Sequence, residues 1–86
     1  MSPEPAYWLY LLECEGGRLY AGIAVDVEQR FYRHVLGVGA KFTRAFAPLR
    51  VLAVREYDSK SAALRAEIQL KKLPRSGKLA FFATPP

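Results

Sequence analysis

The sequence predicts an α+β domain in which a three-stranded antiparallel sheet is flanked by helices. Two apolar, aromatic segments surround a pair of glycines, which is the pattern of a β-hairpin. Two later segments carry the capping residues of helices, and a third apolar segment separates them. The expected order along the chain is β-β-α-(short α)-β-α-α, which is typical of one sheet covered by helices.

The hairpin is predicted in the first third of the chain. Residues 6–12 are apolar or aromatic at every position, so both faces of this strand are expected to be covered, as in a central strand. Residues 15–17, Glu-Gly-Gly, supply the positive-φ positions of a tight turn, and residues 18–24 return as the second strand. Strand alternation places Leu19, Ala21 and Ile23 on one face, with Tyr20 and Gly22 on the other.

The first helix is predicted over residues 27–36. Asp26 is a good N-cap, and Gln29 three residues later completes a start that resembles a capping box. Gly37 suits the end of the helix, because glycine adopts the left-handed conformation of a helix C-terminus without strain. Residues 37–44 are expected to form a loop with one helical turn.

The second half of the chain is expected to contribute one strand and two helices. Residues 49–57 read as the third strand. A long helix then begins at Ser59 or Ser61 and runs to Leu73, where the following proline stops it. Residues 76–82 predict a short terminal helix.

Length and composition favour a single soluble domain over residues 1–86, with residues 1–5 flexible. Thirteen basic and eight acidic residues give a net charge of +5, which favours a polyanionic partner, and the solvated surface of a small basic protein is the alternative. Cys14 is the only cysteine, so no internal disulfide can form and a reducing cytoplasm is expected. No apolar run reaches the length of a membrane span, and neither a P-loop nor a nucleophile elbow occurs.

Five polar residues have the side chains needed to cut a phosphodiester with one divalent cation. Each also has a simpler explanation: strand tyrosines usually pack, a lone histidine is often a satisfied buried group, and an arginine one turn after Asp26 can be solvated or ion-paired. Their joint spacing therefore matters more than any one of them. The five are Tyr10, Tyr20, Arg30, His34 and Glu67.

The position of Glu67 on its predicted helix indicates a function without reference to the other four residues. On a helical wheel it falls between two apolar groups, one of Ala63, Ala66 and Leu70 and one of Leu64 and Ile68. A carboxylate on a core-facing arc is costly unless it is paired or binds a cation. Glu67 is therefore a candidate metal ligand, and an ion pair with Lys71 one turn later is the alternative.

These positions together resemble the GIY-YIG nuclease family, in its small stand-alone bacterial branch. The match extends over almost the whole chain. The segments that carry it are Trp8-Leu9-Tyr10, Tyr20-Ala21-Gly22, Arg30 with His34, Gly39-Ala40-Lys41-Phe42-Thr43-Arg44, and Ser61 through Glu67.

The resemblance implies a one-metal hydrolysis of DNA. Glu67 would be the only protein ligand of a Mg²⁺ or Mn²⁺ ion, and Arg30 would neutralise charge on the phosphate. Tyr20 and His34 would help to deprotonate the attacking water, while Tyr10 would position the phosphate or the water.

The resemblance also implies a nucleic-acid partner, DNA rather than RNA, and a role in DNA repair or processing. The phosphate backbone would be held by basic side chains, chiefly Lys41, Arg44, Lys71 and Lys72. Some family members carry a lysine where Ile23 stands and a late asparagine, whereas this chain has no asparagine. Two alternatives therefore stay open: a nucleic-acid-binding module with weak or no activity, and an accessory subunit that needs a protein partner for specificity.

Overall fold

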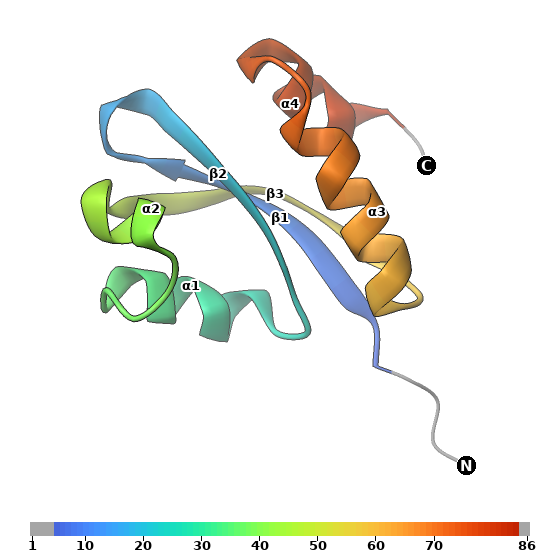
Figure 1. The fold of residues 1–86 in the computed structure, drawn as a ribbon, viewed down its shortest axis with the longest axis horizontal. Coiled ribbons are helices and arrows are strands. Elements are labelled where there is room, and N and C mark those ends of the chain that lie inside the picture. The colour runs from blue at the N-terminus through green and yellow to red at the C-terminus, as the bar shows by residue number, and fades with distance from the viewer. Residues whose placement is uncertain (1–4, 85–86) are drawn as a thin grey trace.

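The computed structural model describes residues 5–84 as a three-stranded sheet with helices on both faces (Figure 1). The predicted α+β class and order of elements are confirmed. The expected flexible start falls largely on residues 1–4, outside the described residues. Within residues 5–84, no helix is long and apolar enough to cross a membrane. The elements are β1 (Tyr7–Cys14), η1 (Glu15–Gly17), β2 (Arg18–Ala24), α1 (Val27–Val35), α2 (Lys41–Ala45), β3 (Pro48–Tyr57), α3 (Lys60–Lys71) and α4 (Arg75–Ala83).

The sheet has the order β2-β1-β3, and both pairings are antiparallel. β1 is therefore the central strand, as its unbroken apolar sequence predicts. The turn before β2 is the single 3-10 turn η1, in which Gly16 and Gly17 have φ values of 75° and 72°. A residue with a side chain is strained at such angles, so the two glycines allow the tight reversal. β2 lies at an edge of the sheet, where its outer side is not covered by another strand.

The two faces of β1 belong to two separate parts of the core. Leu9 and Leu11 point towards α3 and α4, where they pack with Leu70. Tyr10 and Leu12 point towards α1 and α2 on the other face. Cys14 completes that second cluster as a fully buried free thiol, as expected of a small apolar residue. Figure 1 shows the two pairs of helices on opposite sides of the sheet.

α1 begins and ends where its sequence predicts. The Asp26 carboxylate accepts a hydrogen bond from the Gln29 backbone N–H at 3.0 Å, and Gly37 has a φ of 78°. The helical turn expected in the following loop is α2, a helix of five residues. Phe42 of α2 and Phe46, which follows the helix, pack against the core, and the Thr43 side chain is buried against α1.

Ser59 is the N-cap of α3, and its hydroxyl accepts a hydrogen bond from the Ala62 N–H at 3.2 Å. The helix ends at Lys71, two residues before the predicted end at Leu73. Its last turn tightens there, because the Lys72 N–H bonds to the Gln69 and Leu70 carbonyls, and Pro74 disfavours a helical residue before it.

One expectation for α3 is wrong. Leu64 and Ile68 were expected to belong to the core, but their exposed fractions are 38% and 53%. The helix buries only the stripe that contains Ala63 and Leu70, because the sheet covers it on one side. Glu67 therefore stands at the border of the buried stripe and not between two buried groups.

Leu70→Ala is expected to lower the free energy of unfolding by about 2–5 kcal/mol, because it leaves a cavity between α3 and the sheet. Urea denaturation followed by circular dichroism measures the loss. Ile68→Ala, an exposed position on the same helix, is the matched control and should change stability by less than about 1 kcal/mol. Equal losses in the two variants would contradict the packing described here.

Candidate active site

The Tyr10 side chain lies across the edge strand β2, because the residue that it pairs with on that strand is a glycine. Tyr10 and Gly22 are register partners on β1 and β2. A Cβ atom added to Gly22 would lie 2.4 Å from the Tyr10 hydroxyl oxygen, so only glycine lets the phenol occupy this position. The Tyr10 side chain is almost completely buried. Gly22 in the segment Tyr20-Ala21-Gly22 is thus required to make room for Tyr10 on the neighbouring strand.

A chain of hydrogen bonds runs from Tyr10 through His34 to α2. The Tyr10 hydroxyl lies 2.9 Å from His34 Nε2, and His34 Nδ1 lies 2.8 Å from Thr43 Oγ1. Thr43 donates its own hydrogen to the Ala40 carbonyl at 3.0 Å, so its oxygen must accept from His34. His34 therefore carries its proton on Nδ1, and Nε2 accepts the Tyr10 hydroxyl hydrogen.

Sequence reasoning missed two residues that hold His34 in place. A Cβ atom on Gly39 would lie 2.3 Å from His34 Nδ1, so the imidazole fits only against a glycine. Thr43 supplies the hydrogen bond that selects the tautomer. Both belong to the segment Gly39 through Arg44, which is one of the segments that carry the family resemblance and was the available signal. His34 is indeed a satisfied buried histidine, with both ring nitrogens bonded.

The environment keeps both Tyr10 and His34 uncharged near neutral pH. Burial raises the pKa of Tyr10 well above its ordinary value, Tyr20 adds to this effect, Arg30 opposes it, and Glu67 raises the pKa further. Burial also lowers the pKa of His34, and the positive charges of Arg30 and Arg33 lower it further. The pair is thus a neutral phenol donating to a neutral imidazole.

Tyr20 approaches the same histidine without a hydrogen bond to it. Its ring meets the His34 ring edge-on, with centroids 5.2 Å apart, and stacks on Phe42 at 5.6 Å. Among residues 5–84, no hydrogen bond partner of the Tyr20 hydroxyl is found. The family resemblance led us to expect Tyr20 to act with His34, whereas the hydrogen bond joins His34 to Tyr10.

Arg30 is exposed on α1, one turn before His34. Its positive charge acts to lower the pKa of both Tyr10 and His34. Within the described residues it forms no ion pair, so the alternative of a pair with Asp26 is not seen. Arg30 is therefore free to contact an anion beside the two tyrosines.

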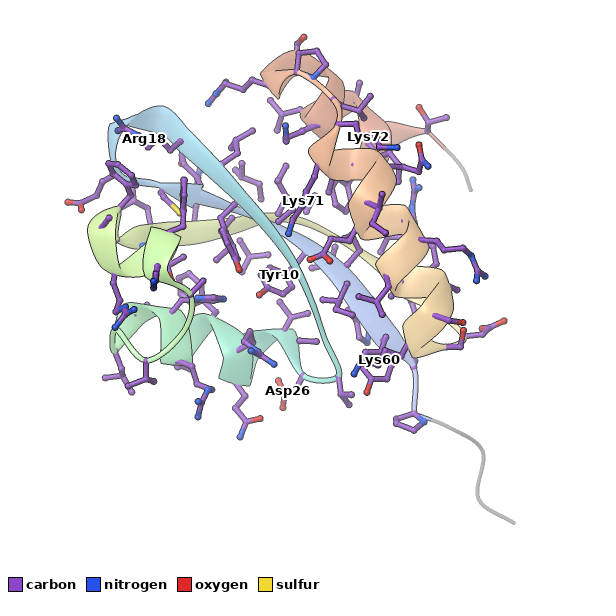
Figure 2. The ribbon with its side chains drawn as sticks, in the orientation of Figure 1. Tyr10, Arg18, Asp26, Lys60, Lys71 and Lys72 are labelled. Atoms are coloured by element: carbon purple, nitrogen blue, oxygen red, sulfur yellow. The ribbon has the colours of Figure 1, made fainter. Side chains whose placement is uncertain are left out.

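Glu67 comes from the helix on the opposite face of the sheet. Its carboxylate lies 3.5 Å from Lys71 Nζ, which is the ion pair considered as an alternative, and its side chain is 16% exposed. Figure 2 draws Lys71 extending from α3 towards β2 and Tyr10. The Glu67 charge also raises the pKa of Tyr10, after the larger effect of burial.

Glu67 fits a magnesium ion only as a single ligand. Within residues 5–84, no group of three or more His, Cys, Asp or Glu side chains could hold a metal. Mg²⁺ often binds through one carboxylate and otherwise keeps water or takes phosphate oxygens. A single, largely buried carboxylate whose one ion-pair partner is an exposed lysine is consistent with this type of magnesium binding.

The basic residues expected to bind nucleic acid do not form one cluster. Lys41 and Arg44 are exposed on α2, whereas Lys71 and Lys72 are at the end of α3, on the other face of the sheet. Lys71 and Lys72 also point in different directions, because successive helical residues differ by about 100°. Only Lys71 is tied to the site, through Glu67.

Curated relatives of similar length match the whole chain. The UPF0213 protein H16_B0156 of Cupriavidus necator is 50% identical over 86 residues, which cover 100% of this chain and 94% of that protein. The UPF0213 protein XAC3202 of Xanthomonas axonopodis pv. citri is 49% identical over 86 residues, covering 100% of this chain and 84% of that protein.

Solved structures and a family model agree with these relatives. The solution NMR structure of protein EF2693 from E. faecalis has a TM-score of 0.65 and 29% identity, covering 96% of this chain and 88% of that one. The UPF0213 protein BH0048 from Bacillus halodurans has a TM-score of 0.56 and 37% identity, covering 91% and 83%. The model of the GIY-YIG catalytic domain matches residues 6–80. This chain therefore belongs to the GIY-YIG family, with the small UPF0213 proteins among its relatives.

Proposed function

We propose that this chain hydrolyses phosphodiester bonds in DNA, with one Mg²⁺ or Mn²⁺ ion and little sequence preference, in DNA repair or processing. The observation that carries the proposal is the hydrogen-bonded chain from Tyr10 through His34 to Thr43, within reach of the charges of Arg30 and Glu67. Membership of the GIY-YIG family supports a nuclease, and a net charge of +5 favours a polyanionic substrate.

The hydrogen-bonded chain supplies a route for one proton. As a water molecule attacks the phosphorus atom, its proton passes to the Tyr10 oxygen, and the Tyr10 proton passes to His34 Nε2. The Nδ1–H···Thr43 hydrogen bond then stabilises the imidazolium that forms. The raised pKa of Tyr10 means that a phenolate does not accumulate, so the two transfers are coupled. In this proposal Tyr10 takes the role that the family resemblance suggested for Tyr20.

In this proposal Arg30 and Glu67 stabilise the negative charge of the phosphate, Arg30 directly and Glu67 by holding a metal ion. The Arg30 guanidinium binds the non-bridging oxygens and neutralises charge that grows in the transition state. Glu67 holds the metal ion, which when bound polarises the phosphate and its leaving oxygen. Lys71 must then leave Glu67, and an i,i+4 ion pair on a helix contributes only a few tenths of a kcal/mol. The Tyr20 hydroxyl is available to orient the attacking water.

A second candidate is a nucleic-acid-binding module without useful hydrolysis. The observation that favours it is the Glu67–Lys71 ion pair, because Lys71 neutralises the carboxylate without any metal. A related version is an accessory subunit that cleaves only with a protein partner. In both cases the basic side chains would hold the phosphate backbone in a salt-dependent manner.

The decisive experiment is cleavage of labelled single- and double-stranded DNA with Mg²⁺ and with Mn²⁺. Arg30→Ala and Glu67→Gln are expected to lower the cleavage rate by about 10²–10³-fold, because each removes charge stabilisation from the transition state. Arg65→Gln, which removes an exposed charge from the outer side of α3, should retain the rate. Undiminished cleavage in Arg30→Ala and Glu67→Gln would refute the site. DNA binding without cleavage by the unaltered chain would support the second candidate.

Thr43→Val is expected to lower the cleavage rate about tenfold, because His34 loses the acceptor for its Nδ1–H group. Thr43→Ser keeps the hydroxyl and should restore the rate. The chain has one histidine, so its ¹⁵N chemical shifts report the tautomer without ambiguity. We expect the Nδ1–H form in the unaltered chain and in Thr43→Ser, and a mixture in Thr43→Val. The same tautomer in all three proteins would contradict the assigned role.

The stability of the fold should fall as the pH drops below about 6.5. Because the fold lowers the His34 pKa, the unfolded chain takes up the proton first, and protonation favours unfolding. The contribution of neutral His34 to the free energy of unfolding is fully present above the ordinary histidine pKa of about 6.5. It is lost as the pH falls from there through the lowered pKa of the folded state. Urea denaturation between pH 8 and pH 5 measures it. His34→Gln should remove this dependence, and an equal slope in that variant would assign it to other groups.

A further inference from the structure

A cavity of about 360 Å³ lies beside the candidate active site, at the end of β2. Its walls come from the start of β1, the end of β2 and the turn after it, α1, and the first residue of α3. Cavities of this size are large enough to take a small ligand. The residues that line it are Tyr7, Ile23, Ala24, Val25, Asp26, Gln29, Arg30, Arg33 and Lys60.

The charged side chains around this cavity favour an anion. Arg30, Arg33 and Lys60 contribute three positive charges against the single negative charge of Asp26. The Asp26 carboxylate already accepts a hydrogen bond from the Gln29 N–H, as the cap of α1. Figure 2 shows Asp26 and Lys60 beside the end of β2, on either side of the turn that follows it.

The three cations have no partner among residues 5–84, neither in an ion pair nor in a hydrogen bond. A second basic cavity, at the opposite end of β2, behaves differently. There the Arg18 guanidinium lies 3.9 Å from the centre of the Phe46 ring, and Arg75 donates to the Gly17 carbonyl at 3.0 Å. Lys78 also donates to a backbone carbonyl, that of Leu73. The cavity beside Arg30 is therefore the one whose cations remain available for a ligand.

The position of Lys60 is unfavourable for the fold alone. It is the first residue of α3, where the helix dipole and unpaired N–H groups repel a positive charge. The first turn of α3 contains no acidic residue that could offset this repulsion. An anion in the cavity would offset it, and would also relieve the repulsion between Arg30 and Arg33 on α1.

We propose that this cavity binds a phosphate of the substrate strand next to the phosphate that is cut. The inference rests on the proposed function, because Arg30 lines the cavity and lies one turn before His34 on α1, and so joins the two sites. Arg33 and Lys60 hold the neighbouring phosphate, and this contact fixes the direction in which the strand crosses β2. The bound group is either an internal phosphodiester or the terminal 5′-phosphate of a strand, which are chemically alike at the cavity.

Binding of short oligonucleotides tests the proposal without any cleavage. The probes are the thymidine trinucleotide TpTpT, its two analogues in which one phosphate is a neutral methylphosphonate, and the dinucleotide pTpT with a terminal phosphate. Affinities are measured by NMR titration in EDTA, where the backbone amides of Gln29, Arg33 and Lys60 report on the cavity. Lys60→Gln removes one cation, and Arg65→Gln on the same helix is the matched control.

We expect TpTpT to shift these amides, and Lys60→Gln to weaken its binding about threefold to tenfold. In the unaltered chain and in Arg65→Gln, one of the two methylphosphonate analogues should bind more weakly than TpTpT by a similar factor. In Lys60→Gln the same analogue should bind almost as well as TpTpT, because the contact to that phosphate is already lost. If Lys60→Gln weakens the binding of pTpT but not that of TpTpT, the group bound in the cavity is the terminal phosphate. Equal losses in Lys60→Gln and Arg65→Gln, or amide shifts elsewhere only, would overturn the proposal. Failure to cleave DNA would refute the proposed function alone, since no readout here requires cleavage.

Discussion

The hydrogen bond between Tyr10 and His34 connects the central strand to the helix α1 that follows the hairpin. It forms in a buried place, where an unpaired phenol or imidazole would cost about 1–3 kcal/mol. Two glycines make it possible, because side chains at Gly22 and Gly39 would collide with the tyrosine and the histidine respectively. The same two glycines thus allow α1 and α2 to pack on the sheet and allow the Tyr10–His34 hydrogen bond of the candidate site to form.

The edge position of β2 explains how the site draws on both faces of the sheet. Tyr10 and His34 lie on the face covered by α1 and α2, whereas Glu67 comes from α3 on the other face. The Glu67 charge nevertheless adds to the effect of burial in raising the pKa of Tyr10. The cavity next to Arg30 lies along the same strand, so β2 provides a line on which successive phosphates can be bound.

Sequence patterns predicted the elements well because local rules decide them. The paired glycines at 16 and 17, the Asp26 cap and Pro74 each act within a few residues, and the structure has the turn and the helix ends there or close by. The helical wheel of α3 failed for Leu64 and Ile68, because a wheel gives the angle between residues and not which side the sheet covers. Thr43 was missed because nothing local distinguishes a buried threonine that fixes a tautomer from any other.

The sequence by itself determined the family, the α+β order and the five candidate residues, because these depend on residue types at fixed spacings. The tertiary structure decided how those residues are paired. His34 forms its hydrogen bond with Tyr10 and not with Tyr20, and Glu67 forms an ion pair with Lys71. Lys41 and Arg44 lie on α2, away from the end of α3. Such pairings depend on distances between residues far apart in the chain, which only the packing of helices on the two faces of the sheet fixes.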